Sequence, residues 1–198
     1  YGFPTGAYVD GGIAEARFNE PRDIAIDSKG NIFVVDTGNH VIRVIKDNKV
    51  YTFAGAGEAG FADKKGTEAK FNQPSGIAID KDDNLYIADT LNHVIRKITP
   101  AGEISTYAGK RSDDGDYQDG SLEEARFNEP TGLAIDGQGT LYVADSGNQR
   151  IRIIKDNKVI TIAGSGTEKN DAGYIIGGYK DGAASQAQFN SRKESKIG

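Results

Sequence analysis

The chain has 198 residues, of which 37% are hydrophobic and 27% are charged, a composition typical of a folded globular protein rather than a disordered one. Its 24 basic and 29 acidic residues give a net charge of −5 without a basic stripe, so we expect no nucleic-acid binding. No apolar run approaches the length that spans a bilayer, so we expect no membrane insertion, and the lack of cysteine excludes disulfides and thiolate metal sites.

The chain repeats itself at a fixed spacing. The motif Phe-Asn-(Glu/Gln)-Pro begins at residues 18, 71 and 127, and its first two residues return at Phe189. The distance from each of the first three Phe residues to the Gly that ends the repeat is 37 or 38 residues, whereas the stretch between repeats varies in length. Rigid units joined by variable connections are typical of a tandem-repeat fold with exposed loops.

Within each repeat, short runs of alternating polarity are separated by turn residues, a pattern typical of antiparallel strands. In the second repeat we expect strands at 77–80, 85–89, 94–98 and 104–108. Four such strands per repeat predict an all-β fold, a β-propeller built from four-stranded antiparallel blades, with three blades in this chain. We expect one propeller segment at 1–190, with blades at approximately 18–55, 71–109 and 127–164, and a tail at 191–198.

A stretch of the form Asp-Gly-x-x-x-x-Ala-x-Phe precedes most of the blades, as in residues 119–127. We expect it to hold one helical turn that tucks Ala125 and Phe127 between adjacent blades, because apolar residues at fixed spacing most often belong to a core.

The second repeat identifies a family. Residues 74–80 read Pro-Ser-Gly-Ile-Ala-Ile-Asp, and residues 84–98 read Asn-Leu-Tyr-Ile-Ala-Asp-Thr-Leu-Asn-His-Val-Ile-Arg-Lys-Ile. This pattern resembles the NHL repeat, a β-propeller unit, and it recurs three times over residues 10–172. The resemblance implies a propeller of six blades, of which this chain holds half. The third repeat departs from the pattern at Gln149, which replaces the His, and the first departs at Asp23, which replaces a Gly.

An Asp ends the second strand of each repeat, and an Arg follows it seven residues later with an Asn between them. Because a hairpin brings such positions together, we interpret these residues as a structural turn clamp. A catalytic group has no reason to recur in every blade. The clamp residues are Asp36, Asn39 and Arg43; Asp89, Asn92 and Arg96; and Asp145, Asn148 and Arg152.

The turn between the second and third strands lies, in an up-and-down blade, at the same end as the exit from the fourth strand. The His and Gln turns and the variable loops therefore share one face. Aromatic residues among glycines in those loops are typical of adaptable recognition surfaces. The candidate binding face comprises Tyr8, His40, Phe61, His93, Tyr117, Gln149, Tyr174 and Tyr179.

Metal chemistry has little support in the sequence. Two histidines in adjacent turns are a thin basis for a catalytic metal site, and we predict no cofactor and no catalytic residues. One acidic stretch, from Asp113 to Asp119, is kept as an alternative calcium loop.

We therefore expect a non-catalytic NHL-type propeller module that binds a protein, peptide or glycan through its loop face. The chain begins at Tyr1 and lacks Met, so we expect a piece of a larger bacterial protein that is extracellular or on the cell surface. The alternative is a metal-dependent lyase or lactonase that uses the propeller channel. Open edges on a half-propeller predict either a homodimer that completes a six-bladed ring or further blades in a longer chain.

Overall fold

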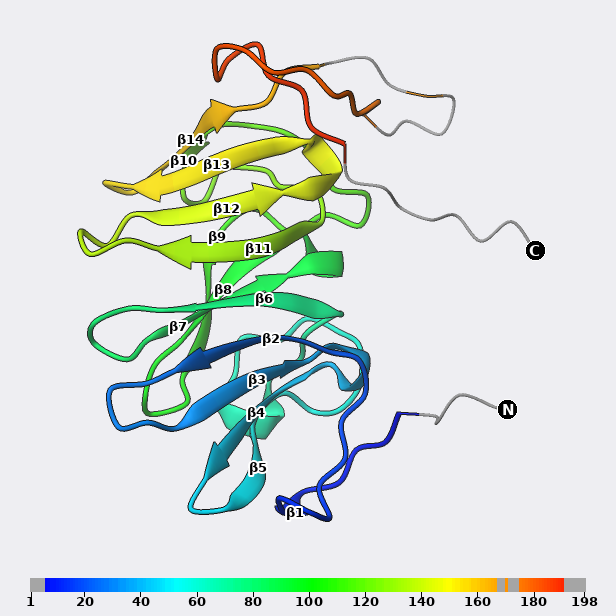
Figure 1. The fold of residues 1–198 in the computed structure, drawn as a ribbon, viewed down its shortest axis with the longest axis vertical. Helices are drawn as coiled ribbons and strands as arrows, with labels where there is room; N and C mark the ends of the chain where they lie inside the picture. The colour runs from blue at the N-terminus through cyan, green and yellow to red at the C-terminus, as the bar shows by residue number, and fades with distance from the viewer. Residues whose placement is uncertain (1–5, 167–169, 171–174, 191–198) are drawn as a thin grey trace.

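The computed structural model describes residues 6–166, 170 and 175–190, and in it three antiparallel sheets follow one another along the molecule (Figure 1). The first blade contains β2 (Pro21–Ile26), β3 (Ile32–Asp36), β4 (Val41–Lys46) and β5 (Lys49–Ala54). The second contains β6 (Pro74–Ile79), β7 (Leu85–Asp89), β8 (Val94–Ile98) and β9 (Ile104–Ala108). The third contains β11 (Pro130–Ile135), β12 (Leu141–Asp145), β13 (Arg150–Lys155) and β14 (Lys158–Ala163). The chain is all-β, and its four-stranded blades are those of a β-propeller, as the sequence predicts.

Each blade is preceded by a segment that we call its connector. The first connector is residues 6–19, the second 56–72, the third 110–128 and the fourth 175–190. Two connectors add a short strand to the outer edge of the following blade: β1 (Gly11–Gly12) pairs with β5, and β10 (Gly120–Ser121) pairs with β14. A connector therefore belongs structurally to the blade that follows it.

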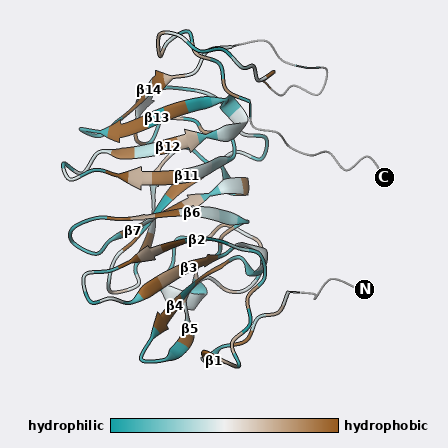
Figure 2. Cartoon of the chain, viewed as in Figure 1, coloured by the Kyte–Doolittle hydropathy of each residue, from teal (hydrophilic) through white to brown (hydrophobic). Residues whose placement is uncertain are grey.

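The core lies between blades, not within them. Hydrophobic residues concentrate on the strands and polar residues on the turns (Figure 2). Val35, Ile42, Ile77, Ile87 and their neighbours form one buried cluster between the first and second blades. A second cluster between the second and third blades contains residues such as Tyr86, Ile95, Leu141 and Val143. Because a single sheet cannot bury both of its faces alone, each blade depends on its neighbours.

The innermost strands β2, β6 and β11 lie side by side. Each begins with a proline, and its pairing with the next strand shifts in register before the third residue. The inner strand of the second blade includes this irregular part and therefore starts at Pro74, earlier than the predicted start at residue 77. Gly76 is required there, because a Cβ on it would overlap the Thr131 carbonyl oxygen. Asp23 takes the same position in the first blade and accepts a hydrogen bond from the Ile77 backbone N–H across the blade boundary.

The helical turn expected before each blade is present in the first, third and fourth connectors. The backbone N–H groups of Ala16, Ala125 and Ala187 each donate to the carbonyl oxygen four residues earlier. In the second connector a 3-10 helix, η2 (Gly66–Glu68), takes its place. Ala125 and Phe127 are buried in the cluster between the second and third blades, as the spacing predicts.

The turn after the second strand of each blade is also a 3-10 helix: η1 (Thr37–Asn39), η3 (Thr90–Asn92) and η4 (Ser146–Asn148). Among the described residues, no helix is long and apolar enough to cross a membrane. Tyr174 and the tail at 191–198 lie outside the described residues, so the prediction of a separate tail remains untested.

Candidate functional site

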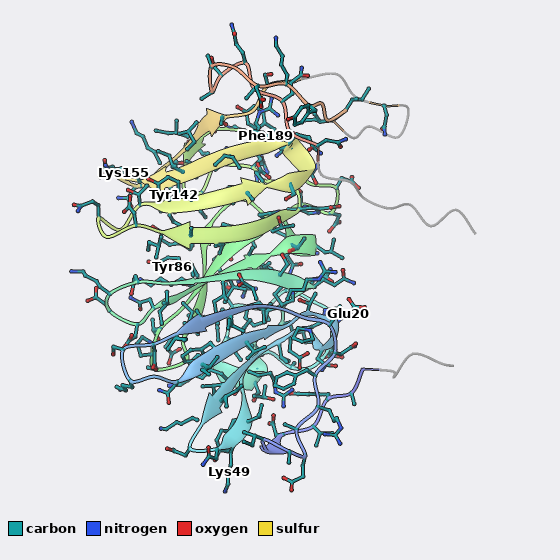
Figure 3. The ribbon with its side chains drawn as sticks, in the orientation of Figure 1. Glu20, Lys49, Tyr86, Tyr142, Lys155 and Phe189 are labelled. Carbon is teal, nitrogen blue, oxygen red and sulfur yellow. The ribbon has the colours of Figure 1, made fainter. Side chains whose placement is uncertain are left out.

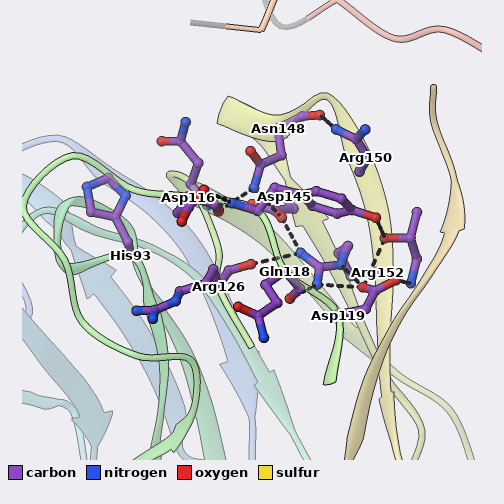
Figure 4. A network of polar contacts seen from close by, with 12 residues as sticks. His93, Asp116, Gln118, Asp119, Arg126, Asp145, Asn148, Arg150 and Arg152 are labelled. Atoms are coloured by element: carbon purple, nitrogen blue, oxygen red, sulfur yellow. Dashed lines mark hydrogen bonds and ion pairs between the residues drawn. The ribbon is translucent and has the colours of Figure 1, made fainter. Parts of the chain in front are cut away.

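An arginine lies at the centre of each blade's polar network, and its side chain is fully buried. In the third blade Arg152 donates to the Asp145 carboxylate at 2.7 Å and to the Asp119 carboxylate at 2.7 and 3.0 Å. It also donates to the carbonyl oxygens of Arg126 and Gln118 (Figure 4). Five hydrogen bonds of this kind satisfy a buried guanidinium, which would otherwise be costly to remove from water.

The same network recurs in the other two blades. Arg43 donates to Asp36 in the hairpin and to Asp10 of the first connector. Arg96 donates to Asp89 and to Asp63 of the second connector. The hairpin carboxylate is the partner that the sequence predicts. The sequence analysis does not predict the connector carboxylate, which lies 33 residues before its arginine. Its signal in the sequence is an Asp that stands eight residues before the Phe of every connector.

Two aromatic rings enclose each buried arginine. The Arg152 guanidinium carbon lies 5.0 Å from the centre of the Tyr117 ring and 5.1 Å from that of Phe127. Arg43 lies in the same way between Tyr8 and Phe18, and Arg96 between Phe61 and Phe71. A cation over an aromatic face is attracted by the ring quadrupole. Each connector thus supplies both rings and one carboxylate, and the blade supplies the arginine.

The hairpin carboxylates are closed to any ligand. Asp89 and Asp145 are fully buried and accept hydrogen bonds from an arginine, an Asn side chain and a connector backbone N–H. Burial raises the pKa of both carboxyl groups to about 6, although the nearby Arg96 or Arg152 and the amide donors act to lower it. A pKa near 6 can mark a general acid or base, but a carboxylate with no exposed surface cannot reach a substrate.

The histidine turns join neighbouring blades. The Nδ1 atom of His40 accepts a hydrogen bond from the Gln73 backbone N–H, and that of His93 accepts one from the Glu129 N–H, both at 3.0 Å. Burial lowers the pKa of His40, which favours the neutral imidazole that this bond requires. His40, His93 and Gln149 all have a left-handed backbone that ends the 3-10 turn.

The structure places the described members of the candidate binding face at one end of the blades. Asn39, Asn92 and Asn148 in the turns donate to carbonyl oxygens of the first, second and third connectors, at 2.8 or 2.9 Å. We call this end, with its turns and connectors, the connector end. Tyr8, Phe61 and Tyr117 lie there over the arginines with one edge in solvent, and Tyr179 projects from the fourth connector.

The acidic stretch in the third connector does not gather into a cation site. Asp113 forms an ion pair with Arg111, and Asp119 is held by Arg152 and Thr161. Within residues 6–166, 170 and 175–190, no three His, Cys, Asp or Glu side chains come together as a metal site.

A hollow of about 450 Å³ lies at the opposite end, between the turns of the second and third blades. Asp80 and Asp136 line it, but their carboxylates accept hydrogen bonds from their own turns and from Tyr86 and Tyr142. The fold itself therefore engages both of these carboxylates.

These blades have close relatives. The family model for the SMP-30/gluconolactonase/LRE-like region matches residues 6–178. The chain belongs to this family. Its repeats are of the NHL type, in agreement with its similarity to human NHL repeat-containing protein 2, which is 32% identical over 164 residues, 75% of this chain and 22% of that protein. Teneurin-4 from Mus musculus is 32% identical over 168 residues, 74% of this chain and 6% of teneurin-4.

Solved structures give the same picture. A putative phosphatase from Bacteroides thetaiotaomicron is 30% identical with a TM-score of 0.59, covering 69% of this chain and 34% of that one. An auxiliary nutrient binding protein from the same organism is 28% identical with a TM-score of 0.59, covering 70% and 36%. Virginiamycin B lyase from Staphylococcus aureus, 18% identical with a TM-score of 0.50 over 71% and 40%, shares the fold alone. The chain therefore spans a minor part of the length of each of these proteins.

Proposed function

We propose that this family member is a non-catalytic module of a larger bacterial surface or secreted protein, and that it binds a protein, peptide or glycan at the connector end. One observation carries the proposal. The titratable groups that recur among the blades are used by the fold: the hairpin carboxylates of all three blades hold arginines without any exposed surface, and the imidazoles of the first two blades accept backbone N–H groups of the next blade.

What remains at the connector end is suited to recognition. The rings of Tyr8, Phe61 and Tyr117 are held rigidly by the arginines beneath them, and each keeps an exposed edge. Rigid aromatic edges provide contact area at a low cost in conformational entropy. The loops beside them vary in length from blade to blade, which suits specificity. The similarity to auxiliary nutrient binding proteins of Bacteroides supports both a binding role and a location at the cell surface or outside the cell.

The second candidate is a metal-dependent lyase or lactonase, which is suggested by the family description and by the likeness of the fold to that of virginiamycin B lyase. The described residues do not fit a divalent metal, because no three His, Cys, Asp or Glu side chains among them come together. The hairpin carboxylates are paired with arginines, and both His Nδ1 atoms already accept hydrogen bonds. Titration of the chain with divalent cations, followed by calorimetry, tests this candidate. Stoichiometric binding of a catalytic metal would favour the enzyme over the binding module.

Glycan and peptide arrays probed with the labelled chain test the binding proposal. In one variant, residues 111–114 are replaced by Gly-Ser-Gly-Ser; this removes the ion pair between Arg111 and Asp113 and leaves the Arg152 network intact. A matched control, Lys81→Ser with Asp82→Ser, alters the opposite end of the blades. We expect the first variant to bind the array hits at least about tenfold more weakly and the control to bind as the wild type. Loss of binding in the control alone would show that the assigned face is wrong.

A further inference from the structure

The turns between the first and second strands of the blades lie next to one another at the end opposite the connector end (Figure 1). An aspartate opens each turn, and its Oδ1 atom accepts the backbone N–H groups two and four residues later at 2.8–3.0 Å. The N–H group three residues later donates to the carbonyl oxygen of the same aspartate. Asp27, Asp80 and Asp136 are therefore equivalent, and the three turns correspond residue by residue.

Between the first and second blades these turns are bonded to each other. The backbone N–H and the hydroxyl of Ser28 both donate to the Asp83 carboxylate, at 2.8 and 2.6 Å. Asp83 has a left-handed backbone, with φ of 60°, at the position where the other turns have Gly30 and Gly139. Glycine adopts this conformation most readily, so the bond that Asp83 forms across the boundary explains an aspartate here.

The second and third blades cannot form this bond. Lys81 takes the position of Ser28, and Gly139 takes that of Asp83. A Cβ on Gly139 would meet nothing within 4 Å. The two turns therefore stay apart, and the hollow of about 450 Å³ lies between them. This volume falls in the range of sites that bind small molecules.

Three polar side chains that line the hollow are not used by the fold. Lys81, Asp82 and Gln138 line it, and none of their side chains forms a hydrogen bond or an ion pair with a residue that the structure describes. The carboxylates of Asp80 and Asp136, in contrast, accept bonds from their own turns. The hollow thus offers a positive donor, a negative acceptor and an amide that can both donate and accept.

Part of the wall is apolar. Ile79, Ile135 and Tyr86 contribute to it, and Tyr86 lies near the turns at this end of the blades (Figure 3). The Tyr86 hydroxyl donates to the Asp80 carboxylate at 3.2 Å, so its hydrogen is already engaged. An apolar wall beside one unpartnered ammonium and one unpartnered carboxylate suits a small molecule that carries both charges on a hydrocarbon frame.

We propose that the hollow is a second binding site and that its ligand is a zwitterion, a free α-amino acid with an apolar side chain. The Lys81 ammonium pairs with the carboxylate of the ligand, the Asp82 carboxylate pairs with its ammonium, and the apolar wall contacts its side chain. Such charge-assisted hydrogen bonds are stronger than neutral ones. A simple cation or a simple anion matches only one of the two charges. The site is separate from the connector end and does not depend on the function proposed there.

An NMR titration of the isotope-labelled chain with L-leucine and L-phenylalanine tests the ligand class. Three probes are the controls: N-acetyl-leucine lacks the ammonium, leucinamide lacks the carboxylate, and putrescine has two ammonium groups and no carboxylate. We expect both amino acids to shift the amide signals of Gly137 and Gly139, which line the hollow. The three probes should bind at least about tenfold more weakly, because each loses a charge-assisted hydrogen bond. The proposal is wrong if neither amino acid binds, or if any probe binds as well as leucine.

Two charge variants test the residues that hold the ligand. Lys81→Met and Asp82→Asn should each weaken leucine binding at least about tenfold. Both residues are exposed in a turn, so both variants should melt as the wild type does. The matched control, Lys29→Met, lies in the equivalent turn of the first blade and should bind leucine as the wild type does. Unchanged binding in both charge variants, or an equal loss in the control, would contradict the assignment.

A third variant closes the hollow. Gly139→Asp introduces the residue that the second blade has at Asp83, with a carboxylate opposite Lys81 as Asp83 lies opposite Ser28. The added side chain has free space around it. We expect this variant to melt no lower than the wild type and to lose leucine binding. If it is folded and binds leucine as the wild type does, the ligand does not occupy the hollow.

Discussion

Burying an arginine is costly unless it is paired and hydrogen-bonded, and here each one takes two carboxylates, two carbonyl oxygens and two rings. The Nε–H groups of Arg43 and Arg152 also donate to a connector carboxylate, whereas that of Arg96 has no acceptor among the described residues. The sequence predicts the Asp and Arg of the hairpin because they are seven residues apart in adjacent strands. It does not predict the connector carboxylate or the inter-blade role of the His turns. Those contacts join segments that are distant in the chain, and only the three-dimensional arrangement brings them together.

Asp89→Ala and Arg96→Ala should each destabilise the protein by about 3–5 kcal/mol, because each leaves a buried charge without one partner. In the double variant neither charge is left, so the loss should be smaller than the sum by about 1–3 kcal/mol. Urea unfolding of the four proteins measures this coupling. Full additivity would mean that the two residues do not act as one network.

His40→Gln tests the inter-blade bond through its pH dependence. Burial lowers the pKa of His40 below 6.5, so the unfolded chain takes up a proton at higher pH than the folded one. Wild-type stability should therefore fall as the pH drops from about 7.5 to about 5.5. The variant carries the residue that the third blade uses at Gln149 and should lose less stability over this range, as measured by urea unfolding at each pH. Equal pH dependence in both proteins would mean that His40 does not contribute to the pH dependence of stability.

Three of the four strands of the second blade were predictable from the sequence, whereas the start of the innermost strand was not. Alternating polarity and turn residues give the second, third and fourth strands of the second blade with their observed bounds. The inner strand carries a register shift between Pro74 and Gly76, which breaks the alternation. The length of this strand follows from its pairing with β7, which the alternation of polarity along the sequence does not predict.

Gly76→Ala should destabilise the protein by about 1–3 kcal/mol, because the new methyl group meets backbone of the adjacent blade. Gly137→Ala is the control: it lies in an exposed turn with nothing within 4 Å of the added Cβ. Thermal unfolding should separate the two variants. A Gly76→Ala protein as stable as the control would mean that the inner strands are not in close contact.

In the whole molecule, the residues that recur in every blade hold the blades together as one unit. Both hydrophobic clusters lie between blades, and each arginine ties a connector to the blade that follows it. No blade is complete alone. The three-blade organisation was predictable from the repeat spacing, whereas the links between the blades were not, because they depend on which faces meet.

Differential scanning calorimetry of the wild type and of Arg43→Met shows whether the blades unfold as one unit. Arg43 belongs to β4 of the first blade. Its replacement should nevertheless shift one cooperative unfolding transition of the entire chain to lower temperature, by roughly 2–4 °C for each kcal/mol of unfolding free energy lost. The control, Arg111→Met, changes an exposed ion pair and should leave the transition in place. Separate transitions for the blades, or an Arg43→Met protein that melts as the wild type does, would contradict the account.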